Sequence, residues 1–527
     1  MPRTEEALRR HARHYCEVLR RANHLYVAGG AGVTEGLKEF NRERFNIQKG
    51  FEWAAASSAD TGSGAVALLS SYASSGAHLL SLRAHPQERL RWFTKALEAA
   101  RRAGDPTAEV SHLESIGIAY ANMGDPRRSI EYHEQQLRLA RDIGSRFAEA
   151  AALGHLGADY VVLSEHRRAV DLYEQELAIA REIENLDGQS TALAGLGTAH
   201  LELGEPQRAV EFFAAAMIIN TAMGDTRGEG FLLSCLGTAR SRLGDTALAI
   251  DYFERALAVV AELDDGQRRV HILGNLGNSY FLNGDPRRAI ELFEAQLETA
   301  REIGDHSEEA EALSNLGYTY IALGRLQDAA EPLERHLAIA REIGASAAIG
   351  DALVDLGFLH LELRETATAI SYFEQSLDIA RRNKEPYAEG RTHGHLGNAF
   401  FEAGELEQAI SHHEQHLSIA RRIGDRVGEC SALGNIGKGY ALRWEPQGAI
   451  EFYEQSLACA QEIGDRQGEA DALFNIALAL DMSDDLDAAA AKAEAALSIY
   501  EYLSSPRAEL ARRQLEAWRA APANGDD

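Results

Sequence analysis

The sequence has few cysteines, and they stand far apart. Cys16, Cys235, Cys430 and Cys459 form no C-x-x-C pair, which excludes the dense cysteine framework of a small disulfide-stabilised domain. We therefore expect these four residues to be reduced thiols that fill small places in the core of a cytoplasmic protein.

Long apolar runs are also missing. The chain has no stretch of about 18 apolar residues, and its first residues, MPRTEEALRRHARHY, lack the apolar segment of a signal peptide. The sequence thus predicts neither a membrane span nor export, and we expect the protein in the cytoplasm.

Basic residues are scarce relative to acidic ones. The 527-residue chain carries 53 Lys and Arg against 81 Asp and Glu, a formal net charge of −28. A field of this sign repels phosphate backbones and anionic membrane surfaces, so we expect neither nucleic acid nor a membrane as a partner. With 45% hydrophobic residues, the chain still has enough apolar side chains to fold.

The main positive feature is a repeat of 40 residues that spans most of the chain. A glycine recurs at this spacing, preceded in every copy by Ile or Leu, and Leu stands four places before it in every copy except one, which has His393. A weaker copy occupies residues 66–106. The glycines are Gly117, Gly157, Gly197, Gly237, Gly277, Gly317, Gly357, Gly397 and Gly437, with Ala477 in the last copy.

Each copy predicts two amphipathic helices. Around the glycine, apolar residues recur at i, i+3, i+4 and i+7, the pattern of one buried helical face; we call this helix A. After a short turn such as MGDP at 123–126, a second stripe of small, aromatic and Leu residues predicts helix B, which ends near a glycine such as Gly304. A glycine inside helix A costs ~1 kcal/mol relative to alanine, so we expect a neighbouring helix to lie too close for a methyl group.

The phrases L-x-x-L-G-x-x-Y and A-I-x-x-[YF] followed by Leu resemble the tetratricopeptide repeat in its 40-residue form. The resemblance implies an all-α fold, a right-handed superhelical solenoid of about eleven helical hairpins. It also implies a non-catalytic scaffold that binds a protein or peptide in a concave groove lined by the helices A. The domain organisation that follows is a helical adaptor at 1–65, a degenerate first repeat at 66–106, ten repeats at 107–503, a capping helix at 504–521 and a disordered tail at 522–527.

Residues 1–106 suggest an alternative function. Helical stretches around 4–26 and 36–57 flank the glycine-rich linker VAGGAGVTEG at 27–36, and together with residues 81–100 they resemble the entry to the repeat half of NB-ARC-type signalling ATPases. That resemblance implies a sensor or regulatory subunit of a STAND-type switch, acting on an ATPase that is encoded separately.

Motifs for catalysis or metal binding are missing. The glycine-rich linker is not followed by Lys and then Ser or Thr, and no strand is predicted before it, so it does not match a phosphate-binding loop. Histidines cluster between His393 and His416, where a metal-dependent hydrolase is the alternative interpretation. Yet no H-E-x-x-H occurs, and His413 takes the place that Phe213 and Phe253 hold in other copies. We therefore expect no enzyme activity, no metal and no cofactor.

The candidate site is a series of polar residues on helix A. In the repeat family, the places two before and one after the glycine face the concave groove, and from residue 267 onward asparagine predominates there, with Asp355 and Phe358 interrupting the series. A carboxamide both donates and accepts, so it can bind the N–H and C=O groups of a peptide whatever its side chains; the alternative is that asparagine is merely tolerated beside glycine. The predicted groove residues are Asn275, Asn278, Asn315, Arg391, His395, Asn398, Asn435, Lys438 and Asn475.

Overall fold

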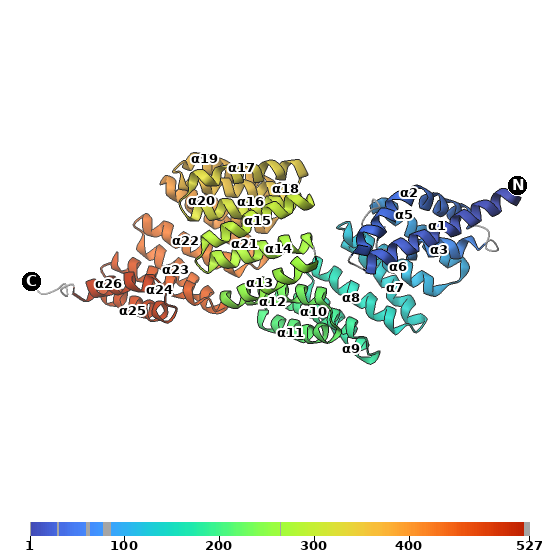
Figure 1. Ribbon diagram of the computed structural model, residues 1–527. Helices are drawn as coiled ribbons and strands as arrows, with labels where there is room; N and C mark the ends of the chain where they lie inside the picture. The colour runs from blue at the N-terminus through green and yellow to red at the C-terminus, as the bar shows by residue number, and fades with distance from the viewer. Residues whose placement is uncertain are drawn as a thin grey trace, which may run out of the picture. The chain divides into compact units, whose positions relative to one another are not determined.

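The computed structural model describes residues 2–28, 31–58, 64–76, 79, 86–263 and 265–520. Within these residues all regular secondary structure is α-helical (Figure 1), which confirms the predicted all-α fold. The chain divides into two compact units, Met1–Asp264 and Asp265–Asp527, and in each unit successive helices pack on one another. The tail predicted at 522–527 lies outside the described residues.

The first unit begins with helices that precede the regular repeats. They are α1 (Pro2–Ala28), α2 (Ala31–Ser57), α3 (Ala65–Ser75) and α5 (Pro86–Ala103). In their core Phe51 stacks on Trp92 with ring centroids 3.9 Å apart, and the Tyr72 hydroxyl donates a 2.7 Å hydrogen bond to the carbonyl of Ala12. The segment predicted as a separate adaptor therefore shares one hydrophobic core with the degenerate first repeat.

The flexible linker predicted at 27–36 is mostly helical instead. Only residues 29–30 separate α1 from α2, and these two lie outside the described residues. Gly36 packs on α1, because a Cβ there would stand 2.5 Å from the carbonyl oxygen of Ala22. The prediction failed because a glycine-rich phrase favours a loop as long as no close neighbour is visible.

From residue 106 onward, helices A and B alternate at the predicted spacing of 40 residues. In the first unit the helices A are α6 (Pro106–Asn122), α8 (Arg146–Val162), α10 (Leu186–Glu202) and α12 (Thr226–Arg242), and the helices B are α7 (Pro126–Asp142), α9 (His166–Glu182), α11 (Pro206–Met223) and α13 (Thr246–Leu263).

The second unit continues the alternation. Its helices A are α14 (Gly266–Leu282), α16 (His306–Ala322), α18 (Ser346–Glu362), α20 (Pro386–Ala403), α22 (Arg426–Leu442) and α24 (Arg466–Asp481). Its helices B are α15 (Pro286–Ile303), α17 (Leu326–Ile343), α19 (Thr366–Asn383), α21 (Leu406–Ile423), α23 (Pro446–Ile463) and α25 (Leu486–Tyr502). A last helix, α26 (Arg507–Ala520), packs on α25 and buries Leu515 and Trp518 there.

The turns between helices follow from their residues. Asp125 caps α7 by accepting a 3.1 Å hydrogen bond from the backbone N–H of Arg128, and Pro126 begins the helix where no N–H is needed. Gly304 ends α15 with φ 71°, a left-handed conformation that glycine adopts without strain.

The glycine of helix A has the predicted packing role. A Cβ at Gly277 would stand 2.5 Å from the ring of Phe293 on the helix B of the same repeat, and a Cβ at Gly397 would stand 2.5 Å from the imidazole of His413. Each repeat therefore presses one ring against its glycine, and His413 is a packing residue in the place of a phenylalanine.

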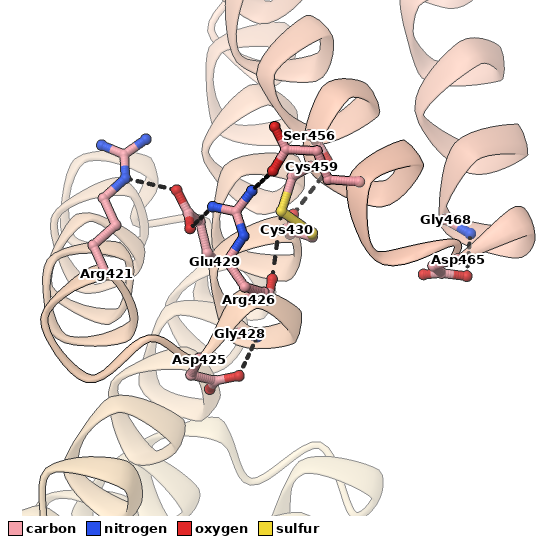
Figure 2. Close-up of a disulfide and its surroundings, with 11 residues drawn as sticks. Arg421, Asp425, Arg426, Gly428, Glu429, Cys430, Ser456, Cys459, Asp465 and Gly468 are labelled. Atoms are coloured by element: carbon pink, nitrogen blue, oxygen red, sulfur yellow. Dashed lines mark hydrogen bonds and ion pairs between the residues drawn. A yellow bond between two sulfur atoms is a disulfide. The ribbon is translucent and has the colours of Figure 1, made fainter. Parts of the chain in front are cut away.

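The prediction of reduced thiols is wrong for one pair. Cys430 in α22 and Cys459 in α23 form a disulfide with their Cα atoms 5.5 Å apart (Figure 2). The helical hairpin brings together two residues that are 29 apart in sequence, a proximity that no C-x-x-C spacing announces. Beside the disulfide, Glu429 pairs with both Arg421 and Arg426 (Figure 2). Cys16, in contrast, is buried in the N-terminal core, as predicted.

Candidate functional site

The predicted groove residues occupy places on the helices A that solvent reaches. The residues between them, such as Leu276 and Gly277 in α14, are buried against helix B. The polar places therefore form one face of each helix A. Asn275, Asn278, Arg391, Asn398 and Lys438 are exposed, and Asn315, His395, Asn435 and Asn475 are half-buried.

One cavity brings together part of this set. It has a volume of about 250 Å³ and lies between α20 and α22. Arg391, His395 and Asn398 line it from α20, Asn435 lines it from α22, and His416 of α21 lies among them. A guanidinium, two carboxamides and two imidazoles thus converge on one space.

A second cavity of about 360 Å³ lies between α22 and α24. Asn435 lines this cavity too, together with Lys438 and Asn475. At its edge Arg507 of the last helix pairs with Asp471 at 2.7 Å. The two cavities therefore adjoin at Asn435 and extend over three consecutive helices A.

The remaining predicted residues stand apart from these cavities. Asn275 and Asn278 lie on α14 and Asn315 on α16, and they line neither space. The Asn315 Nδ2 atom is nevertheless buried without a hydrogen-bond partner. The structure thus groups the C-terminal members of the series and leaves the first three separate.

The two cations of the site are held against aromatic rings. The Arg391 guanidinium lies 5.9 Å from the centroid of the Tyr387 ring, and the Lys438 ammonium lies 5.0 Å from that of Phe401. Such contacts fix a cation without neutralising it. They leave two positive charges on this face of a strongly acidic chain.

His395 is the most buried ionisable group among the predicted residues. Burial, and next the Arg391 charge, lower the pKa of its imidazole to about 4. The ring is therefore neutral at physiological pH, and its Nε2 atom is buried without a hydrogen-bond partner. It can donate to, or accept from, a ligand at no electrostatic cost.

A second set of polar residues was missed by the sequence analysis apart from His416. These residues lie on the helices B, three places after the aromatic residue that packs on the repeat glycine, and all are buried; we call them the floor residues. A polar residue recurring every 40 positions inside an apolar stripe was the signal that could have revealed them. They are Gln136, Glu176, Gln296, His336, Ser376, His416 and Ser456, with alanine in the other three repeats.

The histidine cluster is built by packing and by hydrogen bonds. The Nδ1 atoms of His393 and His412 lie 2.9 Å apart, and burial is the main cause that lowers the pKa of His393 to about 4. Within the part of the chain that the structure describes, no group of three or more His, Cys, Asp or Glu side chains is placed to hold a metal ion. In the same described ranges, no helix is both long and apolar enough to cross a bilayer.

Comparisons with solved structures return helical-repeat proteins. The apo form of the quorum sensor NprR from B. thuringiensis is 14% identical, with 67% of this chain and 98% of that chain covered and a TM-score of 0.48. A STAND protein with a tetratricopeptide repeat sensor, PH0952 from Pyrococcus horikoshii, is 14% identical, with 85% and 74% covered and a TM-score of 0.46. At these values, neither match says what the present chain binds.

Comparison with protein families gives a stronger result. Tetratricopeptide repeat models match residues 113–147, 148–219, 229–295, 268–342, 348–422, 389–462 and 428–501. No curated protein sequence matches the chain. Since the family matches extend over well more than half of its residues, and since its helices alternate at the same period, the chain belongs to the tetratricopeptide-repeat family.

Proposed function

We propose that the protein is a non-catalytic scaffold that binds an extended segment of a protein partner along the helices A of its second unit. The observation that supports this most is the pair of adjoining cavities on α20, α22 and α24. Six of the nine predicted residues line them: Arg391, His395, Asn398, Asn435, Lys438 and Asn475.

The spacing of the amides suits a peptide backbone. Asn398 and Asn435 belong to consecutive helices A, which pack ~10 Å apart, a span of about three residues of an extended chain at ~3.3 Å each. Each carboxamide can accept from a backbone N–H and donate to a backbone C=O. The acidic charge of the chain as a whole favours a neutral or basic partner.

The test uses a peptide identified by affinity capture and cross-linking mass spectrometry, titrated by fluorescence anisotropy into the full chain. A neutral hydrogen bond contributes about 0.5–1.5 kcal/mol, so Asn398→Ala combined with Asn435→Ala should weaken binding by roughly 10- to 100-fold. The control is Asn283→Ala, an exposed asparagine in the turn after α14. Equal affinity of the double variant and the control, at unchanged helix content, would refute the groove assignment.

Two finer proposals accompany this one. The sensor role implied by the resemblance of residues 1–106 is a special case of partner binding, and co-purification with a separately encoded ATPase would support it. The cytoplasmic location also stays a proposal, and it has a consequence for Cys430 and Cys459, because reducing compartments keep such pairs as thiols.

A further inference from the structure

The first unit has its own cavity on the helices A. It has a volume of about 520 Å³ and lies between α8 and α10, with α9 beneath it. Its lining is mostly apolar and includes Val161 and Tyr173, and the exposed rings of Phe147 and Phe231 stand at its edge. Exposed aromatic rings beside an apolar cavity are typical of a surface that another molecule covers.

Two glycines open this cavity. Gly195 stands two places before the repeat glycine, where the second unit has residues such as Asn275. A Cβ at Gly195 would stand 2.5 Å from the Tyr173 ring, and a Cβ at Gly154 would stand 2.7 Å from both carboxylate oxygens of Glu176. Because neither glycine carries a side chain, residues of α9 reach the cavity directly.

Glu176 is the floor residue of this repeat, and its carboxyl group lacks a partner. The residue is 4% exposed and lines the cavity, and its Oε2 atom is buried without a hydrogen bond. The equivalent Gln296, in contrast, donates a 3.3 Å hydrogen bond to Glu308. A buried carboxylate is unfavourable unless a donor or a cation satisfies it, so this site is short of one positive or donating group.

The charged and titratable groups around Glu176 supply no cation of the lysine or arginine type. Asp187 of α10, Tyr173 of α9 and His155 of α8 line the same cavity, and no Lys or Arg is among its described lining residues. Burial, and next the Asp187 charge, raise the pKa of the Glu176 carboxyl to about 8. At neutral pH the empty site therefore holds a proton on Glu176.

We infer that this cavity binds a lysine or arginine side chain of the partner segment. The apolar walls would contact the methylene stem, and the Glu176 carboxylate, with Asp187 nearby, would pair with the charged head. Charge complementarity selects this occupant, since the cavity offers two carboxyl groups in a chain of net charge −28. The inference rests on the proposed function, because it names the chemistry of the same partner.

Binding of a cation has a pH signature. A positive charge beside Glu176 favours its ionised form, so the bound state has the lower pKa and binding releases a proton. Affinity should therefore rise as the pH increases from 6.5 to 8.5. Loss of a proton from His155 would act in the same direction, and a substitution at Glu176 separates the two.

The experiment titrates N-acetyl-arginine N-methylamide and its uncharged citrulline analogue into the full chain by calorimetry at pH 6.5 and 8.5. We expect the arginine compound to bind at least tenfold more tightly at pH 8.5, and Glu176→Gln to abolish this preference. Glu174→Gln, which removes an exposed carboxylate from the same helix, should leave it unchanged. Ala158→Trp, at an exposed place in the cavity lining, should weaken both compounds.

Three results would overturn the inference. The first is equal binding of the two compounds, and the second is an arginine preference that survives Glu176→Gln in a variant of normal helix content. The third is binding of n-butylguanidinium as tight as that of the peptide-like compound, which would assign the cavity to a free organic cation. None of these results affects the peptide test on Asn398 and Asn435, so the two proposals can fail separately.

Discussion

Single residues set how closely the two helices of a repeat approach. Where helix A has Gly154, Gly274 or Gly394, the facing floor residue of helix B is large and polar: a Cβ on the glycine would lie 2.7 Å from Glu176, 2.7 Å from Gln296 or 3.1 Å from His416. The glycines thus make room for buried polar groups beneath the helices A. This pairing explains why most floor residues are polar although they lie in an apolar stripe.

The same argument predicts that two glycine substitutions differ in sign. Gly277→Ala should destabilise the chain by about 1–3 kcal/mol through overpacking, because its Cβ would lie 2.5 Å from the Phe293 ring. Gly350→Ala in α18 should be neutral or stabilise by up to ~1 kcal/mol, since its Cβ would have ordinary contacts at 3.7 Å. Urea unfolding followed by circular dichroism measures both, and equal effects would contradict the packing argument.

At the scale of elements, the repeat unit is a helical hairpin held by its own side chains. The α22–α23 hairpin differs from the others described here in having a disulfide across it, between Cys430 and Cys459. Closing a loop of this length stabilises a folded chain by ~3–4 kcal/mol if loss of entropy in the unfolded chain dominates. The effect should be local, because repeats contact mainly their neighbours.

Reduction should therefore loosen this hairpin more than the rest of the chain. We expect dithiothreitol to speed backbone hydrogen exchange in α22 and α23, with little change in α15 or α17. Replacing Cys430 and Cys459 together by alanine should abolish the response to the reductant, whereas Cys16→Ala should preserve it. An unchanged exchange rate in α22 after confirmed reduction would show that the disulfide adds no stability there.

At the scale of the whole molecule, the sequence predicted the fold well because each packing contact repeats every 40 residues. Gly277 and its equivalents, together with the preceding Ile or Leu, marked every helix A, and the turn residues marked the ends. Features that depend on the rotation of one helix against another were not predictable. The Cys430–Cys459 pair is one example, and the meeting of Gly195 with Tyr173 and Glu176 is another.

Many buried histidines make the stability of the molecule depend on pH. Burial is the first cause that lowers the pKa of His133 and His393 to about 4, and that of His413 to about 3. An unfolded histidine has a pKa of about 6.5, so below that pH the unfolded chain binds more protons than the folded chain. The stabilisation is complete above pH 6.5 and is lost as the pH falls toward 3. Asp159 and Glu176, whose pKa values burial raises to about 6 and about 8, act in the opposite direction as the pH rises.

His413→Phe tests this balance at one position. His416, His412 and Lys438 add to the effect of burial on the pKa of His413, and both of its ring nitrogens are buried without hydrogen-bond partners. Phenylalanine fits the place, as Phe373 does one repeat earlier. A histidine that stays neutral when folded loses about 1.4 kcal/mol of stability per pH unit below 6.5, so between pH 7 and pH 5 the variant should lose ~2 kcal/mol less than the parent chain. Hydrogen exchange in α20–α22 at both pH values measures the difference, and an equal loss in the two proteins would mean that His413 takes up a proton without unfolding.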